Sequence, residues 1–273
     1  MEQVIQTVQD LTHLSWTKRR NSSGTAGSFL KSQETMPEGK IFYKLSNYDS
    51  YNGITGHESV NEIIADRLLS ILGIEHVSYQ LIHADILVDA RPIRTWLCAS
   101  YDFRKRKERK ISLDEYYAAN RNNMESPLDF CIRFGWEDYI YRMLVVDYLI
   151  LNRDRHGANI EILINPYKKS VRLAPLFDHG VSLFCRTVNE AALEKEDVMA
   201  DKQVQCFIGS RSAWENLHLI PKDNFPHLNP LKESDKDTLL DRLEDALGRP
   251  WLEKIWEMIF RRWQSYETLR NQG

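Results

Sequence analysis

A short run of mostly basic residues, 104–110, divides the chain into two parts with different hydrophobic patterns. The part before it contains short stretches of strand-forming residues, such as 41–45. The part after it follows helical periodicity, most clearly at 136–151. This order predicts an α+β fold with two lobes, a small β-rich N-lobe over 1–102 and a larger helical C-lobe over 103–273. Ligands commonly bind in the cleft between two such lobes.

Local patterns predict individual elements. Apolar residues recur at helical steps over 59–72, and Gly73 follows where a helix would end in the left-handed conformation. The polar, glycine-containing stretch 47–56 predicts a loop. Further strands are expected at 76–82, 86–88 and 94–100, and further helices at 136–151, 235–247 and 251–270, with Ser234 as the N-cap of 235–247.

Composition excludes several classes of protein. With 273 residues, 42% of them hydrophobic and 27% charged, the chain can bury a sizeable core, which excludes wholesale disorder. Its 36 basic and 39 acidic side chains give a net charge of −3, so overall charge does not favour nucleic acid as a partner. The local basic patch of Arg104, Lys105, Arg106 and Lys107 leaves RNA, DNA or an acidic protein open as partners, although a solvated loop is the favoured interpretation.

Cysteine usage and the N-terminal residues indicate the compartment. The 4 cysteines lie far apart without a C-x-x-C pair, which argues against a zinc framework and a disulfide-stapled secreted scaffold. The first residues are polar and acidic, unlike a signal peptide, and no apolar run approaches the length of a membrane span. We therefore expect a cytoplasmic protein, or a delivered effector without a recognisable N-terminal signal.

The sharpest motif follows the helix expected at 136–151. Asp154 is followed five positions later by Asn159, and an apolar run comes next. This D-x-x-x-x-N spacing is typical of phosphotransferase catalytic loops, where the carboxylate orients or deprotonates an attacking hydroxyl and the amide oxygen binds a magnesium ion. Asp178, in A-P-L-F-D-H-G, is suited to be a second metal ligand, although histidine stands where a DFG segment has phenylalanine.

Three further features upstream fit the same chemistry. The small-residue loop S-S-G-T-A-G-S at 22–28 would let backbone N–H groups approach phosphate oxygens. Lys44 follows on a strand, where it could neutralise the α- and β-phosphates. Glu62, on the next helix, could pair with Lys44 and fix its position, and Glu58 competes for that role. The features occur in the order found in kinases.

Together these motifs resemble the HipA-type serine/threonine kinases, and among them a compact stand-alone branch similar to phosphoinositide kinases. The resemblance rests on the 22–28 loop, the Lys of Y-K-L-S, the Glu of V-N-E-I-I-A-D-R-L-L, N-R-D-R-H-G-A-N and A-P-L-F-D-H-G, and it spans roughly residues 20–185. It implies a bilobal protein-kinase-like fold that binds ATP and Mg²⁺.

The resemblance also implies roles for individual residues. Asp154 would be the catalytic aspartate, Asn159 and Asp178 the magnesium ligands, and 98–103 the hinge that bonds adenine through its backbone. Nucleotide-binding residues would be Ser23, Gly24, Thr25, Ala26, Gly27, Ser28, Lys44, Glu62, Ala99, Ser100, Tyr101 and Phe103.

Regulation is a second implication of the resemblance. In this family, phosphorylation of a serine in the glycine-rich loop switches the enzyme off, and the matching hydroxyls here are Ser22, Ser23 and Ser28. Full-length HipA toxins carry an additional subdomain before this loop, whereas this chain has about twenty residues there, so an antitoxin partner stays open.

The function predicted from these features is transfer of the γ-phosphoryl group of ATP to serine or threonine of a protein substrate. Two alternatives stay open. One is a phosphoinositide (lipid) kinase, because D-R-H-x-x-N recurs in that class. The other is a nucleotide-binding pseudokinase or regulator that acts through partner contacts. His156, between Asp154 and Asn159, is interpreted as structural, and His179 is assigned no role.

Overall fold

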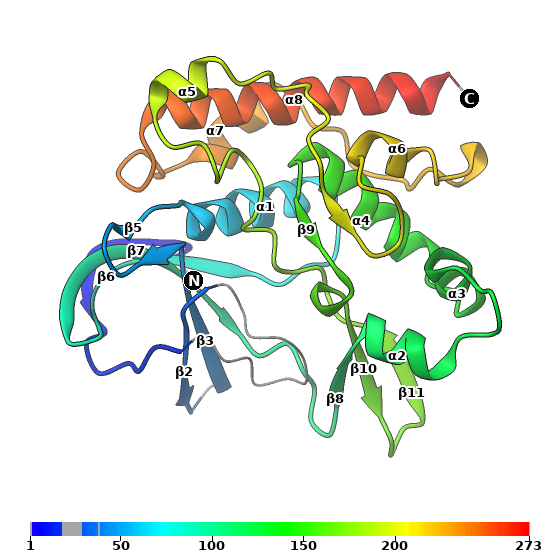
Figure 1. The fold of residues 1–273 in the computed structure, drawn as a ribbon, viewed down its shortest axis with the longest axis horizontal. Coiled ribbons are helices and arrows are strands. Elements are labelled where there is room, and N and C mark those ends of the chain that lie inside the picture. Colours follow the sequence, from blue (N-terminus) through cyan, green and yellow to red (C-terminus); the bar gives the residue numbers. More distant parts are fainter. Residues whose placement is uncertain (1, 18–28, 38, 273) are drawn as a thin grey trace.

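The computed structural model describes residues 2–17, 29–37 and 39–272. In this part of the chain, the N-lobe is a five-stranded sheet with strand order β1-β6-β7-β3-β2 (Figure 1). Strand β1 pairs in parallel with β6, and the other neighbours pair antiparallel. The strands are β1 (Val4–Asp10), β2 (Lys31–Met36), β3 (Gly39–Leu45), β6 (Tyr79–Val88) and β7 (Arg91–Tyr101).

Helix α1 (Glu58–Leu72) lies between this sheet and the helices of the C-lobe (Figure 1). It ends as predicted, with Gly73 in the left-handed conformation at φ 73°. Most of its apolar residues, among them Ile63 and Leu68, are buried in the larger of two apolar cores, which continues into the C-lobe. A smaller core that includes Leu45 and Leu97 belongs to the sheet. The larger core thus crosses the expected lobe boundary at 102, and that boundary remains a prediction.

The C-lobe is mainly helical and is built around α4 (Glu137–Leu149), which contacts α8 (Arg249–Asn271). The remaining helices of this lobe are α2 (Leu113–Asn120), α3 (Pro127–Arg133), α5 (Glu190–Glu194), α6 (Ala213–Leu217), α7 (Asp235–Leu240) and the 3-10 turns Gly157–Asn159 and Lys222–Asn224. No helix among the described residues is long and apolar enough to cross a membrane.

Two small sheets carry the loops that face the N-lobe. Strands β8 (Arg109–Ser112), β10 (Glu161–Asn165) and β11 (Ser170–Leu173) form an antiparallel sheet in the order β11-β10-β8. Strand β9 (Asp154–Arg155) pairs in parallel with β12 (Gln205–Cys206). The predicted catalytic aspartate therefore lies in a short strand whose position is fixed by a partner about fifty residues away in sequence.

Most elements expected around the motifs are present, and three expectations about them were wrong. The strands expected at 76–82 and 86–88 form one continuous strand, β6, because the polar residues between them face outward with cross-strand partners. Asp85, for example, accepts hydrogen bonds from Arg94 of β7 at 2.8 and 2.9 Å. The expected loop 47–56 contains a short two-stranded ladder of β4 (Tyr48–Asp49) and β5 (Gly53–Ile54).

The helix expected at 235–247 stops at Leu240. There the guanidinium of Arg67 donates hydrogen bonds to the carbonyls of Leu239 and Asp241, at 3.0 and 2.8 Å, and Arg242 adopts a positive φ of 58°. These bonds satisfy carbonyls at the helix end that a longer helix would have bonded internally. Ser234 does precede α7, but its side chain makes no capping hydrogen bond.

Candidate active site

A cavity of about 570 Å³ lies between the five-stranded sheet and the C-lobe. Its lining comes from β2, β3 and β7 on the sheet side and from β10 and the segments around Asn159 and Asp178 on the C-lobe side. The residues that sequence patterns predicted for the site and that line this cavity are Lys44, Ser100, Tyr101, Phe103, Asn159 and Asp178. Segments far apart in sequence therefore meet around one volume.

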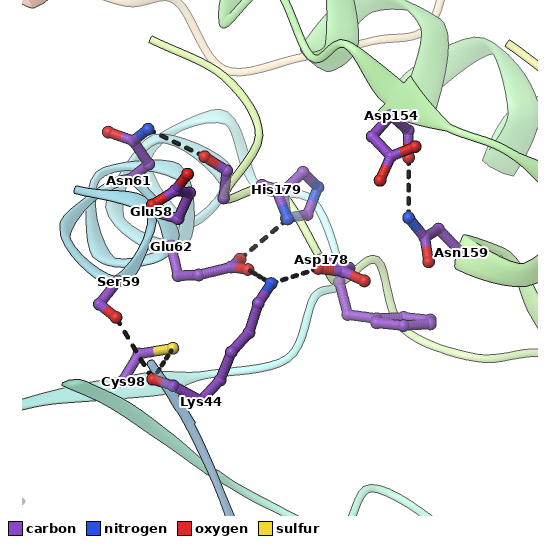
Figure 2. Close-up of polar contacts among 12 residues, drawn as sticks. Lys44, Glu58, Ser59, Asn61, Glu62, Cys98, Asp154, Asn159, Asp178 and His179 are labelled. Atoms are coloured by element: carbon purple, nitrogen blue, oxygen red, sulfur yellow. Dashed lines mark hydrogen bonds and ion pairs between the residues drawn. The ribbon is translucent and has the colours of Figure 1, made fainter. Parts of the chain in front are cut away.

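Lys44 forms the polar centre of the cavity. Its Nζ donates hydrogen bonds to Glu62 Oε1 at 2.9 Å and to Asp178 Oδ1 at 2.5 Å (Figure 2). Burial by itself would lower the pKa of Lys44, but the two carboxylates outweigh it and raise that pKa well above its ordinary value. The amine is therefore a fixed positive charge at the inner end of the cavity.

Glu62 holds Lys44 from the side of helix α1. The Glu62 side chain is 0% exposed, and its second oxygen accepts a hydrogen bond from the backbone N–H of His179 at 2.9 Å. The competing carboxylate, Glu58, instead accepts from the backbone N–H of Asn47 at 2.9 Å. The predicted ion pair of Lys44 with Glu62 is confirmed, and the alternative partner is not used.

Asp178 adopts a left-handed backbone conformation at φ 59°. Such a conformation is uncommon for a residue other than glycine, and residues of this kind cluster at functional sites. The next residue, His179, is buried, and burial, followed by the charge of Arg155, lowers its pKa well below the ordinary value. The backbone carbonyl of His179 accepts a hydrogen bond from Ser182 Oγ at 2.6 Å, so this residue helps to hold the segment after Asp178 in place.

Asp154 is not part of the cavity lining, but it is bonded to Asn159, which is. Its backbone N–H donates to Asn152 Oδ1 at 3.1 Å, and its carbonyl accepts from Asn159 Nδ2 at 2.8 Å. Because of this last bond, the side-chain amide of Asn159 points toward the backbone of Asp154 (Figure 2). The Asp154 side chain stays 30% exposed, and the Nε2 of His156 lies 3.6 Å from its Oδ1. The predicted loop geometry therefore leaves the carboxylate accessible to an incoming group.

Arg155 is a functional residue that motif reading missed. Its side chain is 1% exposed and forms a two-pronged ion pair with Asp147 of α4 at 2.8 and 2.9 Å. The same guanidinium donates to the carbonyls of Asn159 at 3.0 Å and Phe177 at 2.8 Å. Arg155 therefore fixes the distance between the 154–159 loop and the segment that carries Asp178. The acidic Asp147, which interrupts the apolar run 143–151, was the available signal.

Lys110 and Glu161 form a second pair that sequence reasoning missed. Both line the cavity, and Lys110 Nζ donates to Glu161 Oε1 at 2.8 Å. Glu161 Oε2 is buried and has no hydrogen-bond partner among the described residues. The connection 104–110 is mostly exposed, as expected, but its last residue, Lys110, is half-buried and contributes to the cavity.

Within the expected hinge, successive side chains of strand β7 point to opposite faces of the sheet. Ser100 lines the cavity, whereas Ala99 packs in the smaller apolar core on the other face of the sheet. The backbone of both residues lies between strands β3 and β6, because each pairs with a residue of both neighbours. Tyr101 and Phe103, which also line the cavity, stand at the end of β7 and beyond it.

The loop residues named in the sequence, from Ser22 to Ser28, lie outside the described residues. The segments that flank them are described. Thr17 and Lys31 exchange backbone hydrogen bonds at 2.9 and 2.8 Å, and both line the cavity. The ring of Phe29 lies 4.9 Å from Lys44 Nζ, within the range of a cation–π contact. The chain therefore enters and leaves this segment at the rim of the cavity.

The side chains at the cavity suit a magnesium ion bound together with phosphates. Mg²⁺ usually takes one or two carboxylates and fills its other positions with water and phosphate oxygens. Asp178 and Asn159 supply a carboxylate and an amide oxygen on the same wall. No cluster of three or more His, Cys, Asp or Glu side chains that could hold a metal by itself occurs among residues 2–17, 29–37 and 39–272. The donor set thus fits an ion that arrives with a ligand.

Comparison with known proteins identifies the fold. The sequence matches no known family model, and a search of curated proteins finds no match. Among solved structures, the chain is similar to the proinflammatory kinase CtkA of Helicobacter pylori, with a TM-score of 0.63 and 14% identity over 97% of this chain and 98% of that one.

Two further structures are more distant. The HipA toxin of Shewanella oneidensis, solved with HipB and operator DNA, matches with a TM-score of 0.41 and 14% identity over 94% of this chain and 59% of its own. A mutant of the PAN3 pseudokinase of Neurospora crassa matches with a TM-score of 0.36 and 12% identity over 98% and 66%. Of these three structures, CtkA is the one similar enough to compare folds, and by this likeness the chain has the bilobal α+β fold of a kinase, as the sequence predicted.

Proposed function

We propose that the protein is an ATP- and Mg²⁺-dependent kinase that transfers the γ-phosphoryl group to serine or threonine hydroxyls of a protein. One observation carries the proposal. Lys44, in the cavity wall, bonds both to Glu62 of α1 and to Asp178, the residue before His179. Kinases require this combination of a strand lysine, a helix glutamate and a metal-binding aspartate around one site.

Each side chain has a definite part in the proposed reaction. Lys44 would neutralise charge on the nucleotide phosphates, and Asp178 and Asn159 would hold Mg²⁺ through their side-chain oxygens. When bound, the ion supplies charge neutralisation at the β- and γ-phosphoryl oxygens. Asp154, whose side chain stays partly exposed, would orient the acceptor hydroxyl and take its proton as the oxygen attacks.

Autophosphorylation within 22–28 is the second part of the proposal, with Ser22, Ser23 and Ser28 as candidate acceptors. The observation that supports it is the position of the residues on either side of this segment. Thr17 and Lys31, which flank the segment, are bonded to each other at the cavity rim, so the loop begins and ends beside the phosphate-binding side chains.

The test is transfer from γ-labelled ATP by the purified protein, with the Asp154→Ala variant beside it. Three acceptors are offered separately: a mixture of proteins, phosphoinositide vesicles and the protein itself. We expect label on protein serine or threonine, with mass spectrometry placing phosphate in 22–28, and none with Asp154→Ala. Label on the vesicles alone would replace the protein kinase with the lipid kinase. ATP binding without transfer to any acceptor would favour the pseudokinase.

A further inference from the structure

Basic side chains gather on two neighbouring turns outside the cavity. One turn lies in the connection from β7 to β8, and the other joins β10 to β11. Strands β8 and β10 pair antiparallel, with Arg109 opposite Ile164, so both turns lie at the same end of this small sheet (Figure 1). The Nζ of Lys107 lies 4.0 Å from the centre of the Tyr167 ring, so the two turns are in contact.

Six cations on these turns are exposed, and their side chains form no ion pair or hydrogen bond among the described residues. We call them the basic tip: Lys105, Arg106, Lys107, Arg109, Lys168 and Lys169. The carboxylates within the same segments are engaged elsewhere, since Asp102 pairs with Arg104 and Glu108 with Arg172. The whole chain has a net charge of −3 and the basic tip carries +6, so the rest of the chain has a net charge of −9.

The backbone of each turn holds a lysine in an unfavourable conformation. Lys107 and Lys169 have positive φ values of 71° and 50°. Glycine and asparagine adopt this conformation more readily, and other residues held in it are found most often at functional sites. The same exception occurs once in each turn, which favours a role for the positive charge at both places.

We infer that the basic tip binds the surface of a membrane that contains anionic lipids. A cluster of four to eight basic residues suits such a surface, because each lysine or arginine near it is attracted by the negative surface potential. The opposite net charge on the rest of the chain directs the basic tip, rather than another face, toward the bilayer. Tyr167 is 74% exposed beside the cations, and tyrosine is a residue type that favours the membrane–water interface.

A bilayer fits this surface better than single-stranded nucleic acid does. Proteins that bind single strands combine a positively charged groove with aromatic rings on which bases stack. The cations of the basic tip stand on turns, and none of them lines the cavity of the candidate site. The ammonium group of Lys107 already occupies one face of the Tyr167 ring.

Docking at the basic tip also has a consequence for the candidate site. The segment 104–110 begins directly after Phe103 and ends at Lys110, and both of these residues line the cavity. A membrane bound at the basic tip therefore lies on the same side of the molecule as this end of the cavity. The inference goes beyond the proposed activity, because it concerns where the protein is held and not which bond it makes.

Binding to vesicles tests the inference. The full chain is mixed at physiological ionic strength with vesicles of phosphatidylcholine and phosphatidylserine, and bound protein is measured by sedimentation, with vesicles of phosphatidylcholine alone as the blank. We expect Arg106→Gln combined with Lys168→Gln, one substitution in each turn, to weaken binding about 25-fold, which is about fivefold for each charge removed. Both side chains are exposed, so this variant should fold as the parent does.

Lys195→Gln combined with Lys232→Gln is the matched control, because it removes two positive charges from other exposed positions. Lys195 follows α5 and Lys232 precedes α7, and these helices lie at the opposite end of the molecule from the two turns (Figure 1). The control variant should bind the anionic vesicles as tightly as the parent.

The inference is overturned if the parent does not prefer the anionic vesicles to the blank, if the variant of the basic tip binds them as tightly as the parent, or if the control variant loses as much affinity. A single-stranded RNA is titrated in parallel. RNA binding that the variant of the basic tip loses, without any vesicle binding by the parent, would assign this surface to nucleic acid instead. Each result is independent of whether the protein transfers phosphate.

Discussion

At the scale of single residues, the site depends on buried charges that compensate one another. Lys44 satisfies two carboxylates, and Glu62 also accepts a backbone N–H, so each member of the group has a partner. Removing one member of such a buried group leaves the others uncompensated. Glu58, one helical turn before Glu62, differs because its carboxylate accepts a hydrogen bond from a neutral backbone N–H, that of Asn47, and forms no ion pair among the described residues.

Glu58→Gln tests that difference through pH. Burial raises the pKa of Glu58 above its ordinary value of 4.5, so the folded protein prefers this carboxyl protonated and loses stability as pH rises from about 4.5 through the raised pKa. Glutamine keeps the acceptor for Asn47 and cannot ionise. Urea unfolding should therefore show that the stability of the variant relative to the parent increases between about pH 4 and about pH 8. If the difference in unfolding free energy between variant and parent did not change with pH, ionised Glu58 would not destabilise the folded protein.

At the scale of elements, Arg155 connects helix α4, the 154–159 loop and the segment before Asp178. Its ion pair with Asp147 and its bond to the carbonyl of Asn159 are buried, and its bond to the carbonyl of Phe177 is partly buried. Burial by itself would lower the pKa of Arg155. The charge of Asp147 outweighs burial and raises the pKa of Arg155 above its ordinary value. The loop is therefore attached to the helical core at one charged residue.

Arg155→Met should lower the free energy of unfolding by about 3–5 kcal/mol, because it leaves the Asp147 carboxylate buried without a counter-charge. The double variant with Asp147→Leu should recover a large part of that loss, since neither charge then remains. Urea unfolding of the two single variants and the double variant gives the coupling between the sites. Strictly additive losses would contradict the central position given to this ion pair.

Elements were predictable where local chemistry decides them. Gly73 marks the end of α1 by its φ preference, and the apolar spacing before it fixes the helix. The end of α7 was not predictable, because Arg67 of another helix bonds the carbonyls there. Strand β1 was missed for a related reason. It is an edge strand whose residues, except for Val4, are half-buried or exposed, and its parallel partner β6 follows about seventy residues later.

At the scale of the whole molecule, α1 joins the two lobes through one apolar core, and α8 is fixed to the C-lobe by Arg262. That guanidinium is 1% exposed and donates to the carbonyls of Tyr148, Val198 and Ala200. The cavity lies between a sheet and helices whose relative placement depends on such long-range contacts.

The candidate site was predictable in part because a set of polar motifs in a fixed order implies that they converge. Lys44, Asn159 and Asp178 do meet at one cavity. The supporting residues were missed, since Lys110 belongs to a run that reads as solvated and Arg155 is a charged residue in a polar loop, for which Asp147 in the apolar run 143–151 was the one signal. Burial of a charge follows from tertiary packing, which local spacing does not reveal.

The central claim is that this cavity holds ATP with Mg²⁺ and that Asp154 then acts on the acceptor. Calorimetric titration with ATP, with and without Mg²⁺, and transfer of labelled phosphate should be measured on the parent, Asp154→Asn and Asp178→Asn. We predict that Asp154→Asn keeps Mg²⁺-dependent ATP binding and loses transfer by about 100-fold or more, whereas Asp178→Asn loses the Mg²⁺-dependent binding itself. Undiminished transfer by Asp154→Asn, or unchanged Mg²⁺-dependent binding by Asp178→Asn, would contradict the account.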